Sequence, residues 1–421
     1  MSKLTKYKFS DLYEMSSGIS STKEQAGHGS PFVSFSTVFN NFFLPDELTE
    51  LMNTTEKEQN IFSVQKDDVF ITRTSETVDA LAMSCVATKD YPKATFSGFV
   101  KRLRPKKSGI VYSKYIAFFL RSQYFRKVID CNTIMTLRAS FNEDMFSFLY
   151  LYLPEYEEQV RIGDLLYKIE NKIQLNRKIN DNLEQQMKML YDYWFTQFDF
   201  PDNNGNPYRS SGGKLMWNDI IKKDIPQNWR AIPMSDVFKF ESGYPFSSDT
   251  YKTYGKYKLL TIKNVQSNGI NTNVDNYIEE LPANLPEFCL LKPNDILMSL
   301  TGNVGRIGIM YSNDCLLNQR VALAKPVNKE WNSFVYFLLK SDLVHKQYET
   351  IANGSSQQNL SPIEAGNVMI PFCESVTSQF SAICKKHLAT IVANLAENQE
   401  LTNIREWLLP MLMNGQATIE D

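Results

Sequence analysis

The sequence is poor in the residues that build metal and disulfide sites. It has three histidines and six cysteines in 421 residues, and no two of the cysteines form a CxxC pair. A structural zinc site needs several of these ligands at short spacings, so we expect no zinc and no other bound metal. Scattered single cysteines are typical of reduced thiols, which predicts a cytoplasmic protein.

Long apolar runs are also missing. No stretch of 18 or more apolar residues occurs, and the N-terminal residues Met1–Tyr7 contain no apolar core of a signal peptide. We therefore expect no membrane association. A hydrophobic content of 43% and a charged content of 22% are those of a soluble globular protein, with room for two or three domains.

Motifs for nucleotide and cofactor chemistry are missing as well. Leu215 follows the single Gly-Gly-Lys, at Gly212–Lys214, which excludes a phosphate-binding P-loop. The segment Asn206–Tyr208 is only a fragment of the Pro-Pro loop of amino-methyltransferases. The glycine-rich window Thr301–Gly308 lacks dinucleotide-binding spacing and predicts a strand, a turn and a strand, suited to contact a phosphate or base edge. We expect no catalytic centre and no cofactor bound by this chain.

What the sequence does contain is an internal repeat. Two long segments carry seam residues at alternating spacings of four and three, the pattern of a helix with one buried face. The first seam is Ile162, Leu166, Ile169, Ile173, Asn176, Asn180, Leu183, Met187, Leu190 and Trp194. The second, 218 positions later, is Phe380, Cys384, His387, Ile391, Asn394, Asn398, Leu401, Arg405, Leu408 and Leu412. The same two positions are asparagine in both seams, which indicates a duplicated unit.

The segments in front of each helix repeat more weakly. Three matches carry this part of the repeat: Pro31–Val38 with Lys258–Val265, Lys66–Phe70 with Pro293–Leu297, and Ala117–Ser122 with Tyr336–Ser341. Their spacing drifts, so the connecting loops differ in length. The helices remain in frame while these segments diverge, which predicts one scaffold that carries two different specificities.

These patterns predict an α+β chain with a pseudo-two-fold internal repeat. Two mixed α/β domains would be separated by a pair of long antiparallel coiled-coil helices. The expected boundaries are 1–154 for domain one, 155–198 for helix one, 199–224 for a linker, 225–373 for domain two and 374–415 for helix two. A seam of this length must be buried. A second copy of the chain could cover it, but the repeated helix of the same chain is the nearer partner, and the asparagines would fix the register.

Charge is distributed unevenly although the net charge is only −2. Eleven lysines and arginines lie between Lys89 and Lys127, against a single acidic residue, Asp90. We call these eleven residues the basic block. It predicts a positive surface, which either contacts nucleic acid or is a solvated basic face. Basic residues of the second half, Arg320 among them, are dispersed.

Several segments resemble one family, the specificity (S) subunits of type I restriction–modification enzymes. The central conserved region of that family is matched by Tyr193–Pro201, Gly205–Tyr208, Ser211–Gly213 and Ile225–Trp229. The strand that leaves a recognition domain is matched by Asn359–Pro362 with Val368–Pro371, and more loosely by Arg138–Asn142 with Leu151–Pro154. The resemblance covers essentially the whole chain.

The resemblance implies a protein that recognises DNA without catalysis. Each target-recognition domain would read one half of a split double-stranded DNA target through the major groove. Two methyltransferase (M) subunits would dock on the helices, and restriction/motor (R) subunits would join. S-adenosylmethionine and ATP–Mg would then belong to those partners. One alternative is a self-contained DNA methyltransferase or nuclease with fused recognition domains, which needs a cofactor or metal motif. Another is a coiled-coil scaffold without DNA binding.

Candidate DNA contacts are basic side chains for phosphates and polar side chains for base edges. In the first half they are Arg73, Lys101, Arg102, Arg104, Lys106, Lys107, Thr136 and Arg138. In the second half they are Lys263, Asn264, Thr301, Asn303, Arg306, Ser355, Ser356, Gln357 and Gln358. The loops at Thr136–Asn142 and Ser355–Gln358 are expected to lie at the DNA.

Overall fold

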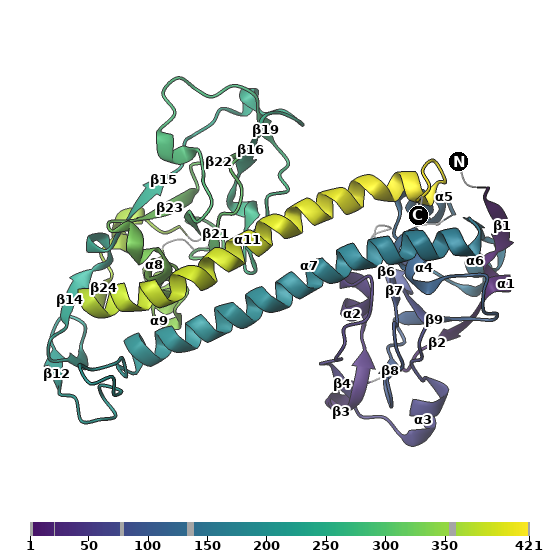
Figure 1. Cartoon of the computed structure of the whole chain (residues 1–421), viewed down its shortest axis with the longest axis horizontal. Coiled ribbons are helices and arrows are strands. Elements are labelled where there is room, and N and C mark those ends of the chain that lie inside the picture. Colours follow the sequence, from purple (N-terminus) through teal and green to yellow (C-terminus); the bar gives the residue numbers. More distant parts are fainter. Residues whose placement is uncertain (1–2, 21, 76–79, 133–138, 353–358, 420–421) are drawn as a thin grey trace. The chain divides into compact units, whose positions relative to one another are not determined.

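The chain is described here from a computed structural model (Figure 1), which describes residues 3–20, 22–75, 80–132, 139–352 and 359–419. It divides into two compact units. Unit 1 is Met1–Ile173 with Glu400–Asp421, and unit 2 is Gln174–Gln399. Both boundaries fall inside long helices, α7 (Tyr156–Tyr191) and α11 (Glu374–Met413). None of the helices among the described residues combines the length and the hydropathy that a membrane crossing requires.

Unit 1 is built on an antiparallel four-stranded sheet. Its strand order is β2 (Tyr13–Ser17), β9 (Val100–Pro105), β5 (Val69–Thr72) and β7 (Ser84–Val86). A smaller sheet has the order β4 (Leu51–Met52), β3 (Ala26–Val33) and β8 (Thr95–Phe96), with β3 and β8 parallel. Two further antiparallel pairs are β1 (Thr5–Lys8) with β11 (Tyr150–Leu153), and β6 (Thr74–Ser75) with β10 (Ala139–Ser140).

Short helices cover the sheets of unit 1. They are α1 (Phe9–Leu12), α2 (Phe35–Asn40), α3 (Glu56–Ile61), α4 (Ser113–Phe119), α5 (Gln123–Asn132) and α6 (Glu143–Phe148). Side-chain caps begin three of them, because Ser34, Thr55 and Asn142 each accept a backbone N–H of the first turn. The apolar face of α4 is fully buried in the core.

Unit 2 repeats this plan. Its main sheet has the order β15 (Phe238–Ser242), β23 (Val321–Pro326), β20 (Ile296–Ser299) and β21 (Ile307–Ile309). A second sheet has the order β19 (Tyr277–Ile278), β16 (Tyr257–Leu260) and β22 (Cys315–Leu317), with β16 and β22 parallel. The remaining strands pair as β12 (Leu215–Asn218) with β13 (Lys223–Pro226), β14 (Arg230–Pro233) with β24 (Met369–Phe372), and β17 (Val265–Gln266) with β18 (Gly269–Ile270). Its short helices are α8 (Asn332–Leu339), α9 (Asp342–Ile351) and α10 (Pro362–Gly366).

The two main sheets correspond strand for strand and in register. The first residues of β2 and β15, Tyr13 and Phe238, face the last residues of β9 and β23, Pro105 and Pro326. The three weak sequence matches fall on equivalent elements: β3 with β16, the turn into β5 with the turn into β20, and α4 with α8. The two units therefore share one strand order and one register in their main sheets.

The turn before β5 and before β20 explains the sequence match between Lys66–Phe70 and Pro293–Leu297. Asp67 and Asn294 both have left-handed backbone, with φ of 68° and 76°. Asparagine and aspartate tolerate that region better than other residues with side chains. The next residue in each unit, Asp68 or Asp295, accepts a backbone N–H from three residues earlier, at 2.8 and 2.7 Å. One turn geometry therefore starts the central strand of both sheets.

Each long helix ends at a change of backbone conformation. The α-helix α7 is followed by one π-helical turn, Asp192–Thr196, and α11 ends just before Gly415, whose φ is 73°. The expected linker 199–224 is ordered, since it contains β12 and a ring stack of Phe200 on Tyr208 with centroids 4.8 Å apart. Turn formers dominate this segment, but aromatic packing holds it in place.

In unit 2 the helices pack against each other in opposite directions. The amide of Asn394 donates to Asn180 at 2.8 Å, and that of Asn176 donates to Asn398 at 3.0 Å. The repeated asparagines therefore meet each other across the two helices. Met187, Ile391 and Cys384 are buried beside them, and burial raises the pKa of the Cys384 thiol to about 12. The thiol is therefore protonated at neutral pH and packs as an apolar group.

In unit 1 the same antiparallel pairing continues. Leu166 and Leu412 are buried in one core, and Arg405 forms an ion pair with Glu170. The seam positions Ile169, Leu183, Leu190, Leu401 and Leu408 are only partly buried, while Ile173 is fully buried.

The second seam also drifts from its expected positions. His387 is partly exposed, and its neighbour Leu388 is buried instead. Leu409 is likewise more buried than Leu408. An α-helix has 3.6 residues per turn, so a strict alternation of four and three slips around the helix over several turns.

One glycine in each unit, at an equivalent position, allows a close contact with a neighbouring segment. We expect alanine at either position to be destabilising. A Cβ on Gly18 would overlap the carbonyl of Phe96, and one on Gly243 would overlap the carbonyl of Asn318. Gly18→Ala and Gly243→Ala should each lower the free energy of unfolding of their unit by about 1–3 kcal/mol. Thermal denaturation measures the loss. Gly366→Ala is the matched control, since its Cβ would meet only an ordinary contact at 3.5 Å. Equal stability of all three variants would contradict the prediction.

Candidate nucleic-acid interface

In unit 1 several loops meet at one end of the main sheet. The N–H of Arg73, after β5, donates to the carbonyl of Phe99, before β9, at 2.8 Å. Next to Arg73, β6 pairs with β10. The N–H of Phe141 completes the group by donating to the carbonyl of Arg73 at 2.8 Å. We call these three segments, 73–75, 97–99 and 139–141, the first strand-end edge.

Unit 2 builds the equivalent group. The N–H of Leu300, after β20, donates to the carbonyl of Arg320, before β23, at 3.1 Å. Thr301 forms a bridge with Asn359, and the N–H of Leu360 donates to the carbonyl of Leu300 at 2.9 Å. These segments, 300–306, 318–320 and 359–360, form the second strand-end edge. Each unit thus presents the same loops on the same scaffold.

The strand-end edges bring together part of the predicted DNA-contacting set. Arg73 is exposed on the first edge, and Thr301, Asn303 and Arg306 lie on the second. The amide oxygen of Asn303 accepts from the Arg306 guanidinium at 3.2 Å when the amide is oriented to satisfy both groups. Six predicted residues lie outside the described residues: Thr136, Arg138, Ser355, Ser356, Gln357 and Gln358.

Lys263 and Asn264 lie in a 3-10 turn after β16, and they differ in whether their side chains can contact an external ligand. Asn264 is buried, and its amide donates to the carbonyls of Asn271 and Asn273 at 2.9 and 3.1 Å. Both of its N–H groups are therefore used inside the turn. Lys263 is exposed, 3.5 Å from Asp275. Only Lys263 can contact an external anion without breaking this turn.

The basic block does not form one surface. Lys101 is buried, and its ammonium group donates to Ser17 at 2.9 Å and pairs with Glu143 at 3.3 Å. Arg102 is buried as well, donates to the carbonyl of Ser63 at 2.6 Å and packs over an aromatic ring. Burial lowers the pKa of the Arg102 guanidinium. These two cations belong to the interior of the domain, so they do not contribute to the positive surface that the basic block predicts.

Arg104 is held by an internal carboxylate. Its guanidinium makes two bonds to fully buried Asp68, at 2.7 and 2.6 Å, and these bonds raise the pKa of Arg104. A bidentate pair of this kind leaves little of the guanidinium for a phosphate. Arg121 is similarly used, donating to four backbone carbonyls, and burial lowers its pKa to about 10.

Lys106 and Lys107 are exposed, but at the other end of the sheet. They follow β9, whereas Phe99 of the strand-end edge precedes it. Six residues at about 3.3 Å each separate the two ends by roughly 20 Å. The structure therefore does not bring these lysines together with Arg73.

Two residues of the strand-end edges were missed from the sequence. Phe99 is 62% exposed, and Arg320 is exposed at the equivalent place. Each directly precedes a buried strand that starts with valine, Val100 or Val321. Their shared position before such a strand could have identified them in the sequence. Neither residue, however, lies in one of the three sequence matches.

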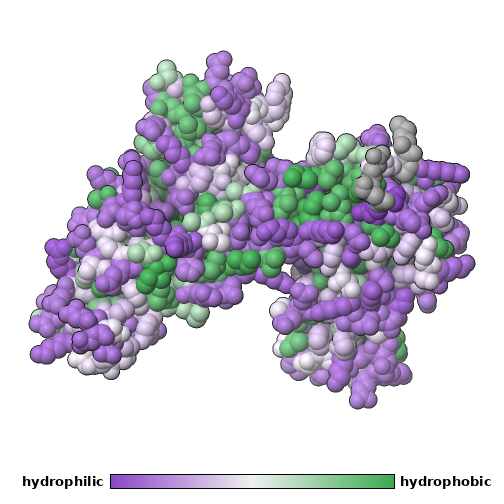
Figure 2. All heavy atoms as spheres, in the orientation of Figure 1, coloured by the Kyte–Doolittle hydropathy of each residue, from purple (hydrophilic) through white to green (hydrophobic). Residues whose placement is uncertain are grey.

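A second kind of surface lies on the long helices, where large apolar side chains face solvent (Figure 2). Two pairs occupy repeat-equivalent positions, 218 residues apart. Leu165 and Ile383 are 36% and 47% exposed, and Met189 and Trp407 are 64% and 68% exposed. Unit 1 contains Leu165 and Trp407. Unit 2 contains Met189 with Ile383. Each unit thus presents one such residue from each helix.

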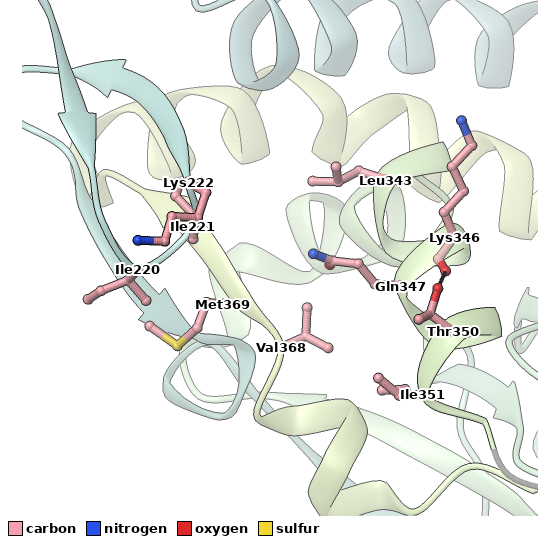
Figure 3. Close-up of a pocket in the computed structure, with 10 residues that line it drawn as sticks. All are labelled: Ile220, Ile221, Lys222, Leu343, Lys346, Gln347, Thr350, Ile351, Val368 and Met369. Atoms are coloured by element: carbon pink, nitrogen blue, oxygen red, sulfur yellow. Dashed lines mark hydrogen bonds between the residues drawn. The ribbon is translucent and has the colours of Figure 1, made fainter.

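Both units contain hollows. One hollow in unit 2, of about 420 Å³, lies between the β12–β13 hairpin, α9 and β24 (Figure 3). Its lining is Ile220, Ile221, Lys222, Leu343, Lys346, Gln347, Thr350, Ile351, Val368 and Met369. No group of three or more His, Cys, Asp or Glu in the described ranges is placed to hold a metal ion.

The Arg104–Asp68 pair predicts a stability effect rather than a DNA effect. Arg104→Met leaves a buried carboxylate without its partner, and this should cost about 3–5 kcal/mol in the free energy of unfolding of unit 1. Lys107→Met is the matched control, because Lys107 is exposed and its loss should change stability by less than about 0.5 kcal/mol. Urea denaturation of both variants measures the difference. An unchanged midpoint for Arg104→Met would refute the structural role.

Comparison with known proteins places these features in a family. The family model described as the type I restriction modification DNA specificity domain matches residues 1–185 and 226–403. These two stretches coincide with the two repeats.

Individual relatives are distant but extensive. The MjaIX specificity subunit of a type I restriction enzyme from Methanocaldococcus jannaschii is 24% identical over 344 residues, covering 80% of this chain and 76% of that protein. The HindI specificity subunit from Haemophilus influenzae is 22% identical over 443 residues, covering 91% and 94%. The crystal structure of a type I restriction–modification S subunit from M. genitalium superposes with a TM-score of 0.59 at 16% identity, covering 98% of this chain and 96% of that one. This last likeness shows the fold.

Proposed function

Because this chain belongs to the type I restriction–modification DNA specificity family, we propose that it selects a bipartite DNA target with its two strand-end edges. One edge would read each half-site. Methyl transfer and ATP-dependent cleavage would belong to partner subunits, which would bring S-adenosylmethionine and ATP–Mg. The chain itself would supply recognition and assembly.

The observation that carries this proposal is the contrast between scaffold and edge. The main sheets of the two units share strand order and register. The side chains on the edges differ, with Arg73 and Phe99 in unit 1 against Leu300 and Arg320 in unit 2. Two equivalent sheets that carry different edge residues suit two different half-site sequences, because direct readout of bases depends on side-chain chemistry.

The exposed apolar pairs on the helices support docking of two methyltransferase subunits. Trp407 and Leu165 would form one docking surface, and Met189 and Ile383 the other. Large apolar side chains at two repeat-equivalent places suit two copies of one partner, since the same partner surface would meet each of them. Exposed aromatic and methionine side chains are also typical of interface centres.

Single substitutions should therefore remove one partner at a time. Trp407→Glu places a charge in one docking surface and Met189→Glu in the other, so each variant should retain one methyltransferase subunit and the double variant none. Native mass spectrometry of the purified complexes counts the subunits. Trp407→Phe and Met189→Leu are the matched controls and should retain two. Two bound subunits on the folded double variant would reject this docking site.

We also propose that α7 and α11 pair along their length and set the distance between half-sites. The antiparallel contacts found in each unit support this, as does the matched length of 36 and 40 residues. At about 1.5 Å per residue each helix is roughly 54–60 Å long. The Asn176–Asn398 and Asn180–Asn394 contacts would hold the register, because a slip would leave polar groups unpaired among apolar ones.

Lengthening both helices should lengthen the unread spacer of the target. Seven residues inserted after Leu183 and seven before Ile391 face each other, so both asparagine contacts survive. The insertion adds roughly 10 Å, equal to about three base pairs at 3.4 Å per pair. Sequencing of methylated bases in cells that carry the complex reads the spacer directly. The same seven residues inserted at exposed Gly205 should leave the spacer unchanged. An active helix variant with its original spacer would show that the helices do not set it.

A further inference from the structure

The residue before β9 and before β23 is presented by one and the same turn. In unit 1 the N–H of Val100 donates to the carbonyl of Ser97 at 2.9 Å, and in unit 2 the N–H of Val321 donates to that of Asn318 at 3.0 Å. Ser97 and Asn318 are both buried. The intervening side chain, at position 99 or 320, therefore points out from an equivalent place on each edge.

The backbone of Phe99 is held from three sides although its ring is exposed. Its N–H donates to the hydroxyl of Ser97 at 3.2 Å, and its carbonyl accepts from Arg73 at 2.8 Å. The preceding Gly98 donates to the carbonyl of Ile19 at 2.7 Å, and a Cβ there would lie 2.9 Å from that oxygen. A backbone fixed in this way presents the exposed ring from a defined place, so no ordering of the backbone is needed when a ligand covers the ring.

Single exposed apolar residues are common on protein surfaces and need no explanation by themselves. Position 99 is different because the two units exchange residue types between this position and the loop beside it. On the first edge a cation follows the central strand, Arg73, and the apolar residue is Phe99. On the second edge the residue after the strand is the buried Leu300, and the cation is Arg320. At these two positions each edge thus has one arginine and one large apolar residue, in exchanged places, while the second edge also contains Arg306.

These chemistries select different base edges in the major groove. Thymine has a 5-methyl group there, which an apolar side chain can contact. Guanine presents two acceptors, O6 and N7, which match the paired N–H groups of a guanidinium.

We propose that positions 99 and 320 are specificity-determining residues of the two units, Phe99 through the methyl group of a thymine in one half-site and Arg320 through O6 and N7 of a guanine in the other. This assignment rests on the proposed function, because it places target DNA on the strand-end edges. It goes beyond that function by naming the residue and the chemical group read in each half-site.

Base analogues test the assignment without disturbing the protein. The complex with the methyltransferase subunits is titrated with target duplexes in which one thymine at a time is replaced by deoxyuridine, or one guanine at a time by 7-deazaguanine. Loss of one contacted methyl group should weaken binding about fourfold at a single thymine. Loss of the N7 acceptor should weaken binding at a single guanine by at least about fivefold.

The variants Phe99→Ala and Arg320→Met assign each effect to a residue. Phe99→Ala should abolish the sensitivity to deoxyuridine and retain the sensitivity to 7-deazaguanine. Arg320→Met should do the reverse, so each variant is the matched control of the other. The two sensitive positions should lie in opposite half-sites. Both side chains are exposed, and thermal denaturation checks that both variants fold.

Two outcomes would overturn the assignment. The first is a wild-type complex whose binding no deoxyuridine or 7-deazaguanine position weakens. The second is a variant that keeps the sensitivity it should lose. Failure of the proposed function gives a distinct result, since a complex that does not select any bipartite target would show no specific binding from which a loss could be measured.

Discussion

Burial of the long helical seams is the constraint on which the rest of the structure depends. A helix of 36 or 40 residues with an apolar stripe is unstable in water unless another surface covers that stripe. Here α7 and α11 cover each other within both units. The ends of the helices also complete the globular cores: Leu412 and Met413 lie in the core of unit 1, and Met187 and Trp194 in that of unit 2. Neither globular core is therefore formed by its own half of the sequence alone.

Within each unit some polar side chains stabilise the sheet and its helices, and others are exposed on the strand-end edge. The cations that look most suited to DNA in the sequence, Lys101, Arg102 and Arg104, hold the framework of unit 1 by bonding Glu143, a backbone carbonyl and Asp68. Buried charge is retained only when it is paired, so these residues are committed before any ligand arrives. The strand-end edges use few residues, but those residues are exposed and differ between units. If the edges carry recognition, as proposed, their side chains can change without disturbing the sheet.

In the proposed function, the duplication would allow DNA recognition and subunit assembly to use separate parts of the chain. The edges differ in chemistry between the repeats, whereas the exposed apolar positions on the helices are matched, Leu165 with Ile383 and Met189 with Trp407. In the proposed function, two different DNA half-sites would require unlike edges, and two copies of one partner would require like docking surfaces. A repeated scaffold would satisfy both demands, because its loops differ between the repeats while its helices stay matched.

The sequence by itself determined the duplication, the two long helices and the family, because heptad spacing and the paired asparagines are local patterns that survive divergence. Only the tertiary structure decided which polar residues are free. Whether Arg104 or Asn264 can contact DNA depends on Asp68 and on the carbonyls of Asn271 and Asn273, partners that no spacing rule connects to them. It likewise placed Arg73 beside Phe99, and Leu300 beside Arg320, since strand pairing brings together loops that are distant in the chain.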